Sequence, residues 1–481
     1  MSEHGGITPR AQDFSAWYND AIMRAELADY SPVRGCMVIR PNGYAIWELM
    51  QRALDDMFKA TGHRNAYFPL LIPQSFLQKE AEHVEGFAPE VAVVTHAGGK
   101  ELDEPLVLRP TSETIIYDSF AKWIQSYRDL PLLINQWANI VRWELRTRLF
   151  LRTTEFLWQE GHTAHADEAD AEREVRRMLG VYRTFAEEWM AMPVLTGVKT
   201  DTEKFAGALR TYAIEGLMQD NKSLQAGTSH HLGQNFARAM EIKFNDINGQ
   251  ESFAWTTSWG VSTRLIGGLI MTHGDDVGIV CPPKLAPTQV VIVPIFRTDT
   301  EREAVMQVVE GVAKELRAAE VRVEVDIRDG MKPGAKYYEW EGRGVPLRLE
   351  VGPKDVAKGQ VFAARRTGGK APIPLGELVD GVDRTLREIQ SGLFRAALER
   401  RESGSRRGVT KDDLVAMMEG PGGFAYGGFC GGRPCEDAIK EATKATVRVL
   451  PDEEFRSPTP PATCVWCGAP SVAEAVWAKA Y

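Results

Sequence analysis

Apolar residues recur at helical spacing in several parts of the chain, and short apolar runs of strand length separate these parts. Residues 44–61 show helical spacing and end before Gly62, a common residue just beyond the last turn of a helix. The pattern also predicts a helix over 113–127, preceded by Pro110, and a long charged helix over 167–192. Because the elements interleave without a regular strand–helix–strand repeat, we expect an antiparallel sheet flanked by helices.

Residues 141–161, VRWELRTRLFLRTTEFLWQEG, predict an antiparallel hairpin with a basic tip. Side chains two apart along a strand share a face, so each arm should present its polar residues together. The residues concerned are Arg142 and Glu144 on one arm, and Arg152, Phe156 and Glu160 on the other. Guanidinium groups match phosphate and carboxylate oxygens, and an aromatic ring can stack on a nucleobase. The hairpin therefore predicts a ligand site, and a solvated hairpin with surface ion pairs is the alternative.

The second half of the chain divides at two points. The proline-rich segment 281–287, CPPKLAP, predicts a boundary, and a compact α/β unit with a helix over 300–319 follows it. A mixed-charge helix over 377–402 comes next, and the sequence SGSRRG at 403–408 predicts a flexible junction. Three domains are therefore expected, over 1–285, 286–402 and 403–481.

Composition narrows the class of protein. Hydrophobic residues make up 44% and charged residues 26% of the chain, as in soluble globular proteins. No apolar run is long enough to span a bilayer and the first residues lack a signal-peptide core, so we expect a cytoplasmic protein without a membrane partner. The net charge of −9 provides no general attraction to nucleic acid, and any RNA contact must come from local patches.

Four cysteines near the C-terminus have the spacing of a metal site. They are Cys430, Cys435, Cys464 and Cys467, in a C-x₄-C and C-x₂-C arrangement. Four thiolates suit a structural, tetrahedral zinc ion, and four reduced surface thiols are the alternative. His162 and His165 form an H-x-x-H pair, but no carboxylate stands at metal spacing and a structural role is favoured.

The chain has no phosphate-binding glycine loop of either common type. A nucleotide would instead be held by arginines on a sheet. Arg264 fits this reading because it stands in TSWGVSTR, at the predicted start of a helix, where the free backbone N–H groups already favour anions. An ordinary arginine on a helix surface is the alternative.

Taken together, these motifs resemble the three signature motifs of class II aminoacyl-tRNA synthetases. The helix at 44–61 with the strand ending at Pro73 resembles the first motif, the arginine-rich hairpin the second, and Gly260-x₃-Arg264 the third. The resemblance narrows to prolyl-tRNA synthetases of the archaeal and eukaryotic kind. It is carried by RPTSET (109–114), RWE (142–144), FLRTTEFLWQEGH (150–162), TEKFAGA (202–208), LQAGTSH (224–230), SWG (258–260) and PLRLEVGP (346–353).

The resemblance implies an α+β catalytic domain with an antiparallel sheet, the class II synthetase fold. An α/β anticodon-binding domain and a small α/β C-terminal zinc-binding domain would follow. The implied catalytic residues are Arg142 and Arg264. The implied ATP contacts are Arg142, Glu144, Arg152, Thr153, Phe156, Gln225, Thr228, Ser262 and Arg264, with Mg²⁺ beside the nucleotide. The implied proline contacts are Thr111, Glu113, Arg142, Trp158, Glu160, Phe205 and His230.

The implied reaction joins L-proline to ATP as prolyl-adenylate and then transfers the prolyl group to tRNA(Pro). The partners are ATP, proline, tRNA and a second copy in a homodimer. Arg348, Glu350 and Lys354 are candidates for reading the anticodon, although an exposed charged edge explains them equally well. The resemblance also places the terminal carboxylate of Tyr481 near the active site.

Too few residues lie between Glu160 and Arg264 to hold an editing domain, so misactivation of alanine or cysteine is expected.

Two other functions compete with that of a prolyl-tRNA synthetase. A non-catalytic paralogue acting as a regulatory or RNA-binding protein would be expected to have lost motif arginines or the amino-acid pocket. A threonyl-, seryl-, glycyl- or histidyl-specific enzyme would lack the pairing of RPTSET with QAGTSH. Proline-dependent exchange of pyrophosphate into ATP separates all three.

Overall fold

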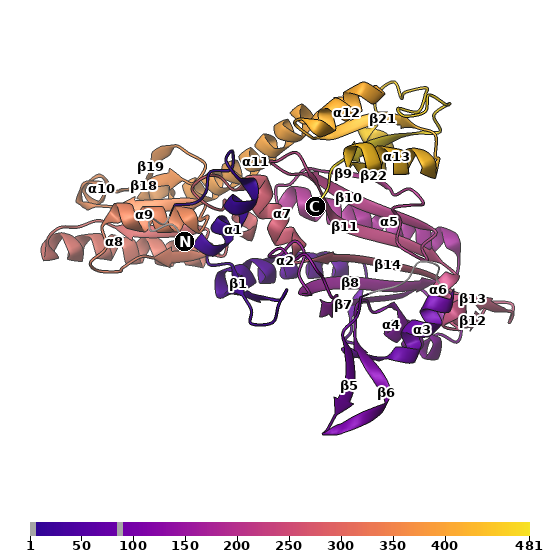
Figure 1. Cartoon of the computed structure of the whole chain (residues 1–481). Helices are drawn as coiled ribbons and strands as arrows, with labels where there is room; N and C mark the ends of the chain where they lie inside the picture. The colour runs from indigo at the N-terminus through magenta and orange to yellow at the C-terminus, as the bar shows by residue number, and fades with distance from the viewer. Residues whose placement is uncertain (1–5, 84–89) are drawn as a thin grey trace.

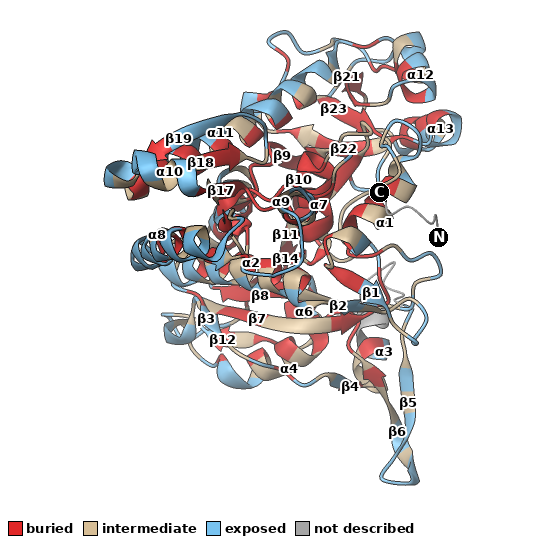
Figure 2. Cartoon of the chain, turned by 90° about the vertical axis from the view of Figure 1, so that its left-hand side faces the viewer, coloured by how far each residue is buried: buried red, intermediate tan, exposed pale blue. Residues whose placement is uncertain are grey.

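A computed structural model describes residues 6–83 and 90–481 of the chain. Figure 1 shows a central sheet with helices around it, an α/β unit on one side and a smaller unit above the sheet. Buried residues fill the middle of the sheet and of both smaller units, whereas the outer helix faces are exposed (Figure 2). Within these described ranges, no helix is both long enough and apolar enough to cross a membrane.

The central sheet is predominantly antiparallel, as the sequence predicted. Its first seven strands, in spatial order, are β3 (Arg64–Asn65), β7 (Leu132–Val141), β8 (Glu155–His165), β14 (Trp255–Ser262), β11 (Ser223–Gly233), β10 (Arg210–Leu217) and β9 (Val194–Val198). In the register, Val141 pairs with Glu155, Glu160 with Gly260 and Thr228 with Gly260. Strands far apart in sequence therefore place their side chains in adjacent rows.

Helices cover the two faces of this sheet unequally. One face is closed by α1 (Phe14–Arg24), α2 (Pro41–Ala60), α5 (Glu168–Thr184) and α7 (Arg264–His273), whose apolar residues form the largest core cluster. The other face is covered only near one end, by α3 (Gln74–His83), α4 (Glu113–Trp123) and α6 (Asn235–Ala239). The rest of that face is left open for a ligand.

Two predicted helices are shorter than the apolar pattern indicated. The helix predicted over 113–127 ends at Trp123, because Ile124 takes an extended conformation. The helix predicted over 167–192 ends at Thr184 and continues as a π-turn over Phe185–Trp189. In both cases apolar residues continue past the last helical turn, so periodicity alone could not place the end.

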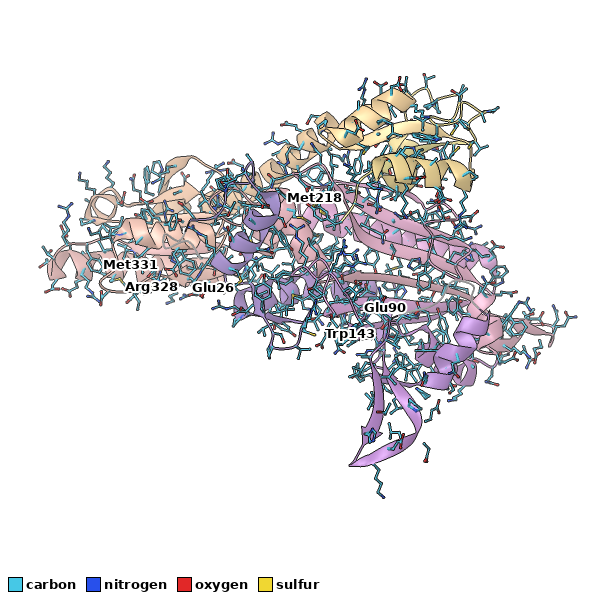
Figure 3. All side chains as sticks on the ribbon, viewed as in Figure 1. Glu26, Glu90, Trp143, Met218, Arg328 and Met331 are labelled. Atoms are coloured by element: carbon cyan, nitrogen blue, oxygen red, sulfur yellow. The ribbon has the colours of Figure 1, made fainter. Side chains whose placement is uncertain are left out.

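The predicted hairpin at 141–161 is present, but its tip is longer than expected. Strand pairing stops at Val141 and Glu155, so Arg142, Glu144 and Arg152 lie in the connecting loop and not on strand arms. The loop bonds partly across itself, where Arg142 N donates to Thr154 O at 2.8 Å, and partly to other parts of the chain. Thr154 N donates to Gly35 O at 2.8 Å, and Trp143 N donates to Glu90 O at 3.1 Å; Trp143 and Glu90 are labelled in Figure 3.

A three-stranded sheet lies beside the open face. It consists of β4 (Leu71–Pro73), β6 (Lys100–Leu108) and β5 (Val93–Ala97), and the β5–β6 hairpin extends away from the body (Figure 1). Two further small hairpins are β1 (Ala28–Tyr30) with β2 (Met37–Ile39), and β12 (Lys243–Asn245) with β13 (Glu251–Phe253). The three-stranded sheet and the two hairpins flank the central sheet and do not close its open face.

The second unit is a five-stranded sheet covered by helices. Its strand order is β16 (Val323–Val325), β15 (Val290–Pro294), β17 (Leu347–Val351), β18 (Gln360–Arg365) and β19 (Lys370–Pro374). The helices are α8 (Asp299–Ala318), α9 (Pro333–Gly342), α10 (Pro353–Lys358) and α11 (Leu378–Ser403). The helices predicted over 300–319 and 377–402 match α8 and α11 within one residue at each end.

The third unit continues the central sheet. Its elements are α12 (Lys411–Glu419), α13 (Arg433–Thr443), β22 (Thr446–Pro451), β23 (Ala473–Ala478), β21 (Phe424–Phe429) and β20 (Ser405–Arg407). Leu450 in β22 pairs with Val198 in β9, which extends the sheet to eleven strands over the described part of the chain. The expected flexible junction at 403–408 was wrong, because 405–407 pair in parallel with β21 as an edge strand.

Candidate active site

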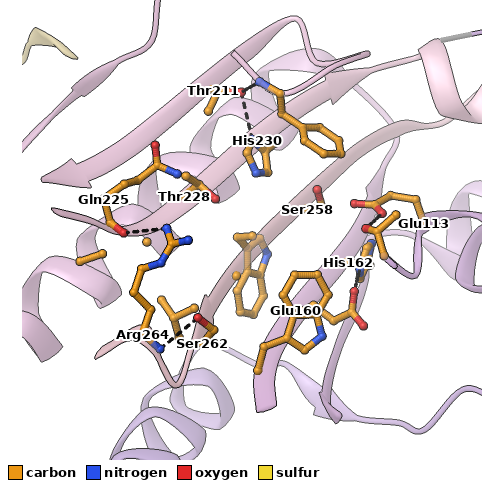
Figure 4. Close-up of a pocket in the computed structure, with 18 of the residues that line it drawn as sticks. Glu113, Glu160, His162, Thr211, Gln225, Thr228, His230, Ser258, Ser262 and Arg264 are labelled. Atoms are coloured by element: carbon orange, nitrogen blue, oxygen red, sulfur yellow. Dashed lines mark hydrogen bonds and ion pairs between the residues drawn. The ribbon is translucent and has the colours of Figure 1, made fainter. Parts of the chain in front are cut away.

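A cavity of about 280 Å³ lies on the open face of the central sheet. Alternate residues of three adjacent strands line it, because side chains two apart point to the same side. They are Phe156, Trp158, Glu160 and His162 from β8, Ser258, Gly260 and Ser262 from β14, and Thr228 and His230 from β11. Figure 4 shows these strands side by side with the labelled side chains turned toward one space.

The floor of the cavity depends on a glycine. A Cβ at Gly161 would lie 2.0 Å from the ring of Trp259 on the neighbouring strand, closer than any real contact. Trp259 is fully buried there and packs against Phe58, with ring centroids 5.0 Å apart. Gly161 therefore lets this indole lie flat against β8, which keeps the two strands in the register that aligns their cavity-facing rows.

One end of the cavity is acidic. Glu113 begins α4 and is almost fully buried, and Thr111 Oγ1 donates a hydrogen bond to its carboxylate. Ser112 occupies the N-cap position of the helix, yet its hydroxyl donates to Glu160 and not to the helix backbone. The N-cap residue of the helix therefore makes no side-chain hydrogen bond to the helix backbone. Both hydroxyls are used to hold carboxylates at the site.

Glu160 is the centre of a buried hydrogen-bond network. Gln136 Nε2 donates to its Oε1 at 2.6 Å, and His162 Nε2 lies 2.9 Å from its Oε2. Burial opposes ionisation of Glu160, but hydrogen bonds from His162, Ser112 and Gln136 outweigh it and lower the pKa of the carboxyl. Burial likewise opposes protonation of His162, yet Glu160 raises the pKa of its imidazole. The pair is thus held as an ion pair in a fixed orientation.

The opposite wall carries a neutral histidine. Thr211 Oγ1 lies 2.9 Å from His230 Nδ1, and the ring of Phe205 packs on the imidazole with centroids 4.7 Å apart. Burial, with the positive charge of His162, lowers the pKa of His230 to about 3. A neutral imidazole facing the cavity, as Figure 4 shows, can exchange a hydrogen bond with a ligand without adding charge.

Two arginines supply positive charge, Arg142 between the two ends of the cavity and Arg264 at the end opposite the carboxylates. Arg142 Nε donates to Pro110 O at 2.8 Å, and Arg264 Nε donates to Leu151 O at 3.2 Å. Burial first, and then the charges of Arg142 and Arg152, lower the pKa of Arg264, although an arginine stays protonated. Arg264 is also the first residue of α7, where the helix dipole is positive. Such a cluster is unfavourable unless an anion neutralises it.

Among the residues that line the cavity, three side-chain polar atoms have no hydrogen-bond partner in the described structure. They are Ser258 Oγ, Trp158 Nε1 and Trp259 Nε1, all shielded from solvent. A buried donor or acceptor without a partner costs free energy, so such groups mark positions that a ligand would satisfy. Together with the acidic and basic ends, they indicate a small zwitterionic ligand beside a polyanion.

Most of the predicted site residues come together in this cavity. They are Thr111, Glu113, Arg142, Phe156, Trp158, Glu160, Phe205, Gln225, Thr228, His230, Ser262 and Arg264. Glu144, Arg152 and Thr153 lie outside the lining, in the loop above it, where Arg152 Nε and Glu144 Oε2 form an ion pair at 2.8 Å.

Several residues that line the cavity were not predicted from the sequence. They include His162, Glu203, Lys204, Thr211, Ala226, Gly227, Ser258, Trp259 and Val261. His162 had a usable signal, because it follows Phe156, Trp158 and Glu160 on the same face of one strand. The structural role favoured for His162 stays a prediction, and the residue also belongs to the cavity wall, where it bonds Glu160. Thr211 had no local signal, since only the fold places it under His230.

The four C-terminal cysteines form a cluster suited to a metal ion. Their sulfur atoms all lie within 4.8 Å of one another, and Cys430 Sγ is 3.6 Å from Cys435 Sγ. Sulfurs bound tetrahedrally to zinc at about 2.3 Å lie about 3.8 Å apart, so the spacing fits. Burial opposes ionisation of Cys464, but backbone N–H donors, led by Cys467, lower the pKa of its thiol to about 7. The donor set thus suits a structural metal.

The anticodon candidates of the second unit differ in exposure. Arg348 is buried, and its guanidinium already bonds Glu350 and Glu341 at 3.0 and 2.7 Å. The guanidinium carbon of Arg348 lies 3.8 Å from the centroid of the Tyr337 ring. Lys354 is exposed on α10. Only Lys354 of the three is thus freely available to another molecule.

The C-terminal residue lies against the arginine-rich loop. Tyr481 Oη donates to Asp220 Oδ2 at 2.6 Å, and the guanidinium of Arg148 lies 5.3 Å from the tyrosine ring. Arg148 stacks on Tyr18 on its other side, at 4.7 Å. The end of the chain thus contacts the loop that carries Arg152.

Three family models match successive parts of the chain. A tRNA synthetase class II core domain (G, H, P, S and T) matches residues 94–273, an anticodon binding domain 289–385, and a prolyl-tRNA synthetase C-terminal domain 411–481. The predicted fold classes of the three units are therefore confirmed.

Full-length relatives agree with these models. Proline–tRNA ligases from Chlorobium luteolum and a Roseiflexus species are 57% and 56% identical, over 99% of both chains in each comparison. A solved prolyl-tRNA synthetase from Cryptosporidium parvum, complexed with halofuginone and AMPPNP, superposes with a TM-score of 0.94 at 39% identity. The match covers 99% of this chain and 100% of that one. The chain belongs to the prolyl-tRNA synthetase family of class II aminoacyl-tRNA ligases.

Proposed function

We propose that this ligase activates L-proline with ATP to prolyl-adenylate and transfers the prolyl group to tRNA(Pro). The observation that carries the proposal is the polarity of the cavity. Carboxylates stand at one end, Arg142 lies between the two ends and Arg264 stands at the other, which suits an amino acid whose imino group and carboxylate point in opposite directions. The same arginines suit the phosphates of ATP.

The proline end would be formed by seven residues. They are Thr111, Glu113, Arg142, Trp158, Glu160, Phe205 and His230. Proline binds as a secondary ammonium with two N–H donors. The Thr111 hydroxyl and the Glu113 carboxylate can accept hydrogen bonds from them. Phe205 and Trp158 supply apolar walls for its ring. Glu160 acts indirectly in this arrangement, because its oxygens are already bonded to Ser112, Gln136 and His162.

The ATP end would be formed by the loop after β7, by β8, β11 and the start of α7. We assign to it Arg142, Glu144, Arg152, Thr153, Phe156, Gln225, Thr228, Ser262 and Arg264. Phe156 would stack against adenine on one side, with Arg264 on the other. Mg²⁺ binds mainly through phosphates and water, and Gln225 and Thr228 provide neutral oxygens beside it. The ion neutralises phosphate charge when bound.

The chemistry needs positioning more than proton transfer. The proline carboxylate is already a nucleophile, so the enzyme has only to align it with the α-phosphorus and to neutralise charge as pyrophosphate leaves. Arg142 stands between the two ends of the cavity and can contact both the carboxylate and the α-phosphate. Arg142 and Arg264 are therefore our proposed catalytic residues.

We further propose that the enzyme is of the archaeal and eukaryotic kind and lacks an editing domain. The segment between Glu160 and Arg264 supports this, because it is taken up by the end of β8, by α5 and α6, and by the six strands β9 to β14 of the core and its small hairpin. Alanine fits a pocket for proline, and a missing methylene costs only about 1–3 kcal/mol. Cysteine is close to proline in size. Misactivation of both is expected.

The remaining assignments complete the proposal. Zinc would be held by Cys430, Cys435, Cys464 and Cys467 as a structural ion. Lys354 is the exposed candidate for the anticodon, with Arg348 and Glu350 as a fixed ion pair beside it. A homodimer, a cytoplasmic location and the domain limits 1–285, 286–402 and 403–481 also stay predictions.

Pyrophosphate exchange tests the function directly. With the purified chain, ATP and labelled pyrophosphate, exchange should appear with proline and more weakly with alanine and cysteine. Arg264→Gln should lower kcat/KM by about 100-fold or more, the loss seen for other preorganised charge donors. Exchange with threonine, serine, glycine or histidine alone would refute the proposed specificity. Absence of exchange with every amino acid would favour a non-catalytic paralogue.

A further inference from the structure

Helix α7 joins the ATP end of the cavity to a distant corner of the molecule. It begins at Arg264 and ends at His273, which is about 15 Å at 1.5 Å per residue. Every residue after Arg264 is buried. A Cβ at Gly267 would lie 2.4 Å from Leu151 Cδ2, so the helix packs tightly against the loop whose carbonyl holds Arg264. Such a helix transmits displacement of one end to the other.

The side chain of Arg264 has few contacts of its own. Its two side-chain hydrogen bonds, to Leu151 O and Gln225 O, are long at 3.2 and 3.4 Å. Long hydrogen bonds are weak restraints. The position of the guanidinium is therefore governed mainly by the backbone of α7.

Side chains from several parts of the chain hold the far end of α7, among them Gln219, whose Nε2 donates to Gly274 O at 2.8 Å. Arg400, from α11, donates to Thr272 O, and Arg10 Nη1 donates to Gly274 O at 3.0 Å. Trp17 Nε1 donates to Asp275 O at 2.8 Å. Donors here satisfy the free carbonyls of the helix end, and the cationic ones also complement its dipole.

The strongest of these contacts comes from the second unit. Arg366, just after β18, donates through both Nη atoms to the two oxygens of Asp275, each at 2.6 Å. Its side chain is only 4% exposed, and its Nε donates to Glu341 O at 2.9 Å. The guanidinium is thus fixed within the second unit and bonds Asp275, which lies two residues beyond the end of α7. Removing Asp275 would leave the buried charge of Arg366 unpaired, and removing Arg366 would leave the carboxylate oxygens of Asp275 without their donors.

We propose that Asp275 and Arg366 are positioning residues for adenylation, whose ion pair fixes the end of α7 so that Arg264 at its start meets the nucleotide. This inference rests on the proposed ATP role of Arg264. The pair links the seating of the second unit to the geometry of the ATP end. The proposed proline contacts come from the first residue of α4 and the segment that leads into it, from the loop after β7, from β8, from the segment between β9 and β10, and from β11, and none of them lies in α7.

A second ion pair between the same two units provides a matched control. Glu26, labelled in Figure 3, follows α1, and Arg343 Nη2 lies 2.7 Å from its Oε2. This pair joins the units without bonding to α7. Loss of the Glu26–Arg343 pair should weaken the same interface between the two units and leave the position of Arg264 unchanged.

The experiment compares Asp275→Asn, Arg366→Met and Arg366→Lys with the controls Glu26→Gln and Arg343→Met. Proline-dependent pyrophosphate exchange gives KM for ATP, KM for proline and kcat, and thermal melting monitors folding. We expect Asp275→Asn and Arg366→Met to lower kcat/KM for ATP by roughly ten- to a hundred-fold, the effect of misplacing a catalytic group by up to about 1 Å. KM for proline should change less than two-fold, and Arg366→Lys should retain part of the activity.

The double variant sharpens the test. If the two residues act only through their pair, Asp275→Asn with Arg366→Met should be no worse than either single change. An unchanged KM and kcat for ATP would overturn the inference, and so would equal losses in the control variants. If a variant melts below the assay temperature, Arg366→Lys decides by the same kinetic criteria. Lack of exchange by the unaltered enzyme would instead refute the proposed function.

Discussion

Glu215 is a fully buried carboxylate at the join between the central sheet and the third unit. Lys199 Nζ lies 2.7 Å from its Oε1, and Arg448 Nη2, from β22, lies 2.9 Å from the same oxygen. Ser223 Oγ donates to Oε2 at 2.6 Å. One negative charge therefore holds two buried cations from opposite sides of the join. We predict that Glu215→Gln weakens this join strongly.

The magnitude follows from the pKa of Glu215. Burial opposes its ionisation, but the charges of Arg448 and Lys199 outweigh burial and lower the pKa from 4.5 to about 2. That difference corresponds to about 3 kcal/mol of stability at neutral pH, within the range found when one partner of a buried ion pair is removed. Because the folded pKa is lowered, this stability is present above about pH 4.5. It is lost as the pH falls toward 2.

Urea denaturation at pH 7 and at pH 3 measures both effects. Glu215→Gln should lower the free energy of unfolding by about 3 kcal/mol at pH 7 and by less at pH 3. The control is Glu454→Gln, because Glu454 also joins the central domain to the third unit, through Arg183. That pair is exposed and should contribute less than about 1 kcal/mol. Equal losses for both variants, or a loss from Glu215→Gln that grows at low pH, would refute the reasoning.

Three further predictions address the site and the metal cluster. Gly161→Ala should lower the free energy of unfolding by about 1–3 kcal/mol, because the added Cβ collides with the ring of Trp259. Urea denaturation measures the change, and an unchanged free energy of unfolding would show that the indole can move. Thr211→Val removes a hydrogen bond of about 1 kcal/mol from His230, so KM for proline should rise about five-fold in pyrophosphate exchange. An equal rise in KM for ATP would contradict this. Cys464→Ser should reduce bound zinc from about one per chain to less than half, measured by atomic absorption; undiminished zinc would place the metal elsewhere.

Local patterns predicted the elements whose ends carry their own signals. Helix α8 follows the N-cap residue Thr298, which forms a capping box with Glu301, and α11 runs through a continuous amphipathic stretch. The rows Phe156, Trp158 and Glu160 follow from strand alternation alone. The same rule would have found His162. These are properties of neighbouring residues, which a sequence displays directly.

Other features needed partners distant in the chain. The loop containing Arg142 and Arg152 looked like strand, but regular pairing stops at Val141 and Glu155, and the backbone N–H groups of Trp143 and Thr154 donate to Glu90 and Gly35. The basic junction at 403–408 looked flexible, yet β21 gives it a strand to pair with. Arg348 looked like an exposed reader of bases, and Glu341 and Glu350 bury it.

By itself, the sequence determined the chemical inventory: which arginines, carboxylates, rings and thiols are available, and in which local rows they stand. Only the tertiary structure decided which of them share a space. Strand register aligns Glu160 with Gly260, and helix α7 carries Arg264 at one end and the grip of Arg366 on Asp275 at the other. The physical reason is that hydrogen bonds and ion pairs act over a few ångströms. The chain distance between their partners therefore tells little until folding has brought them together.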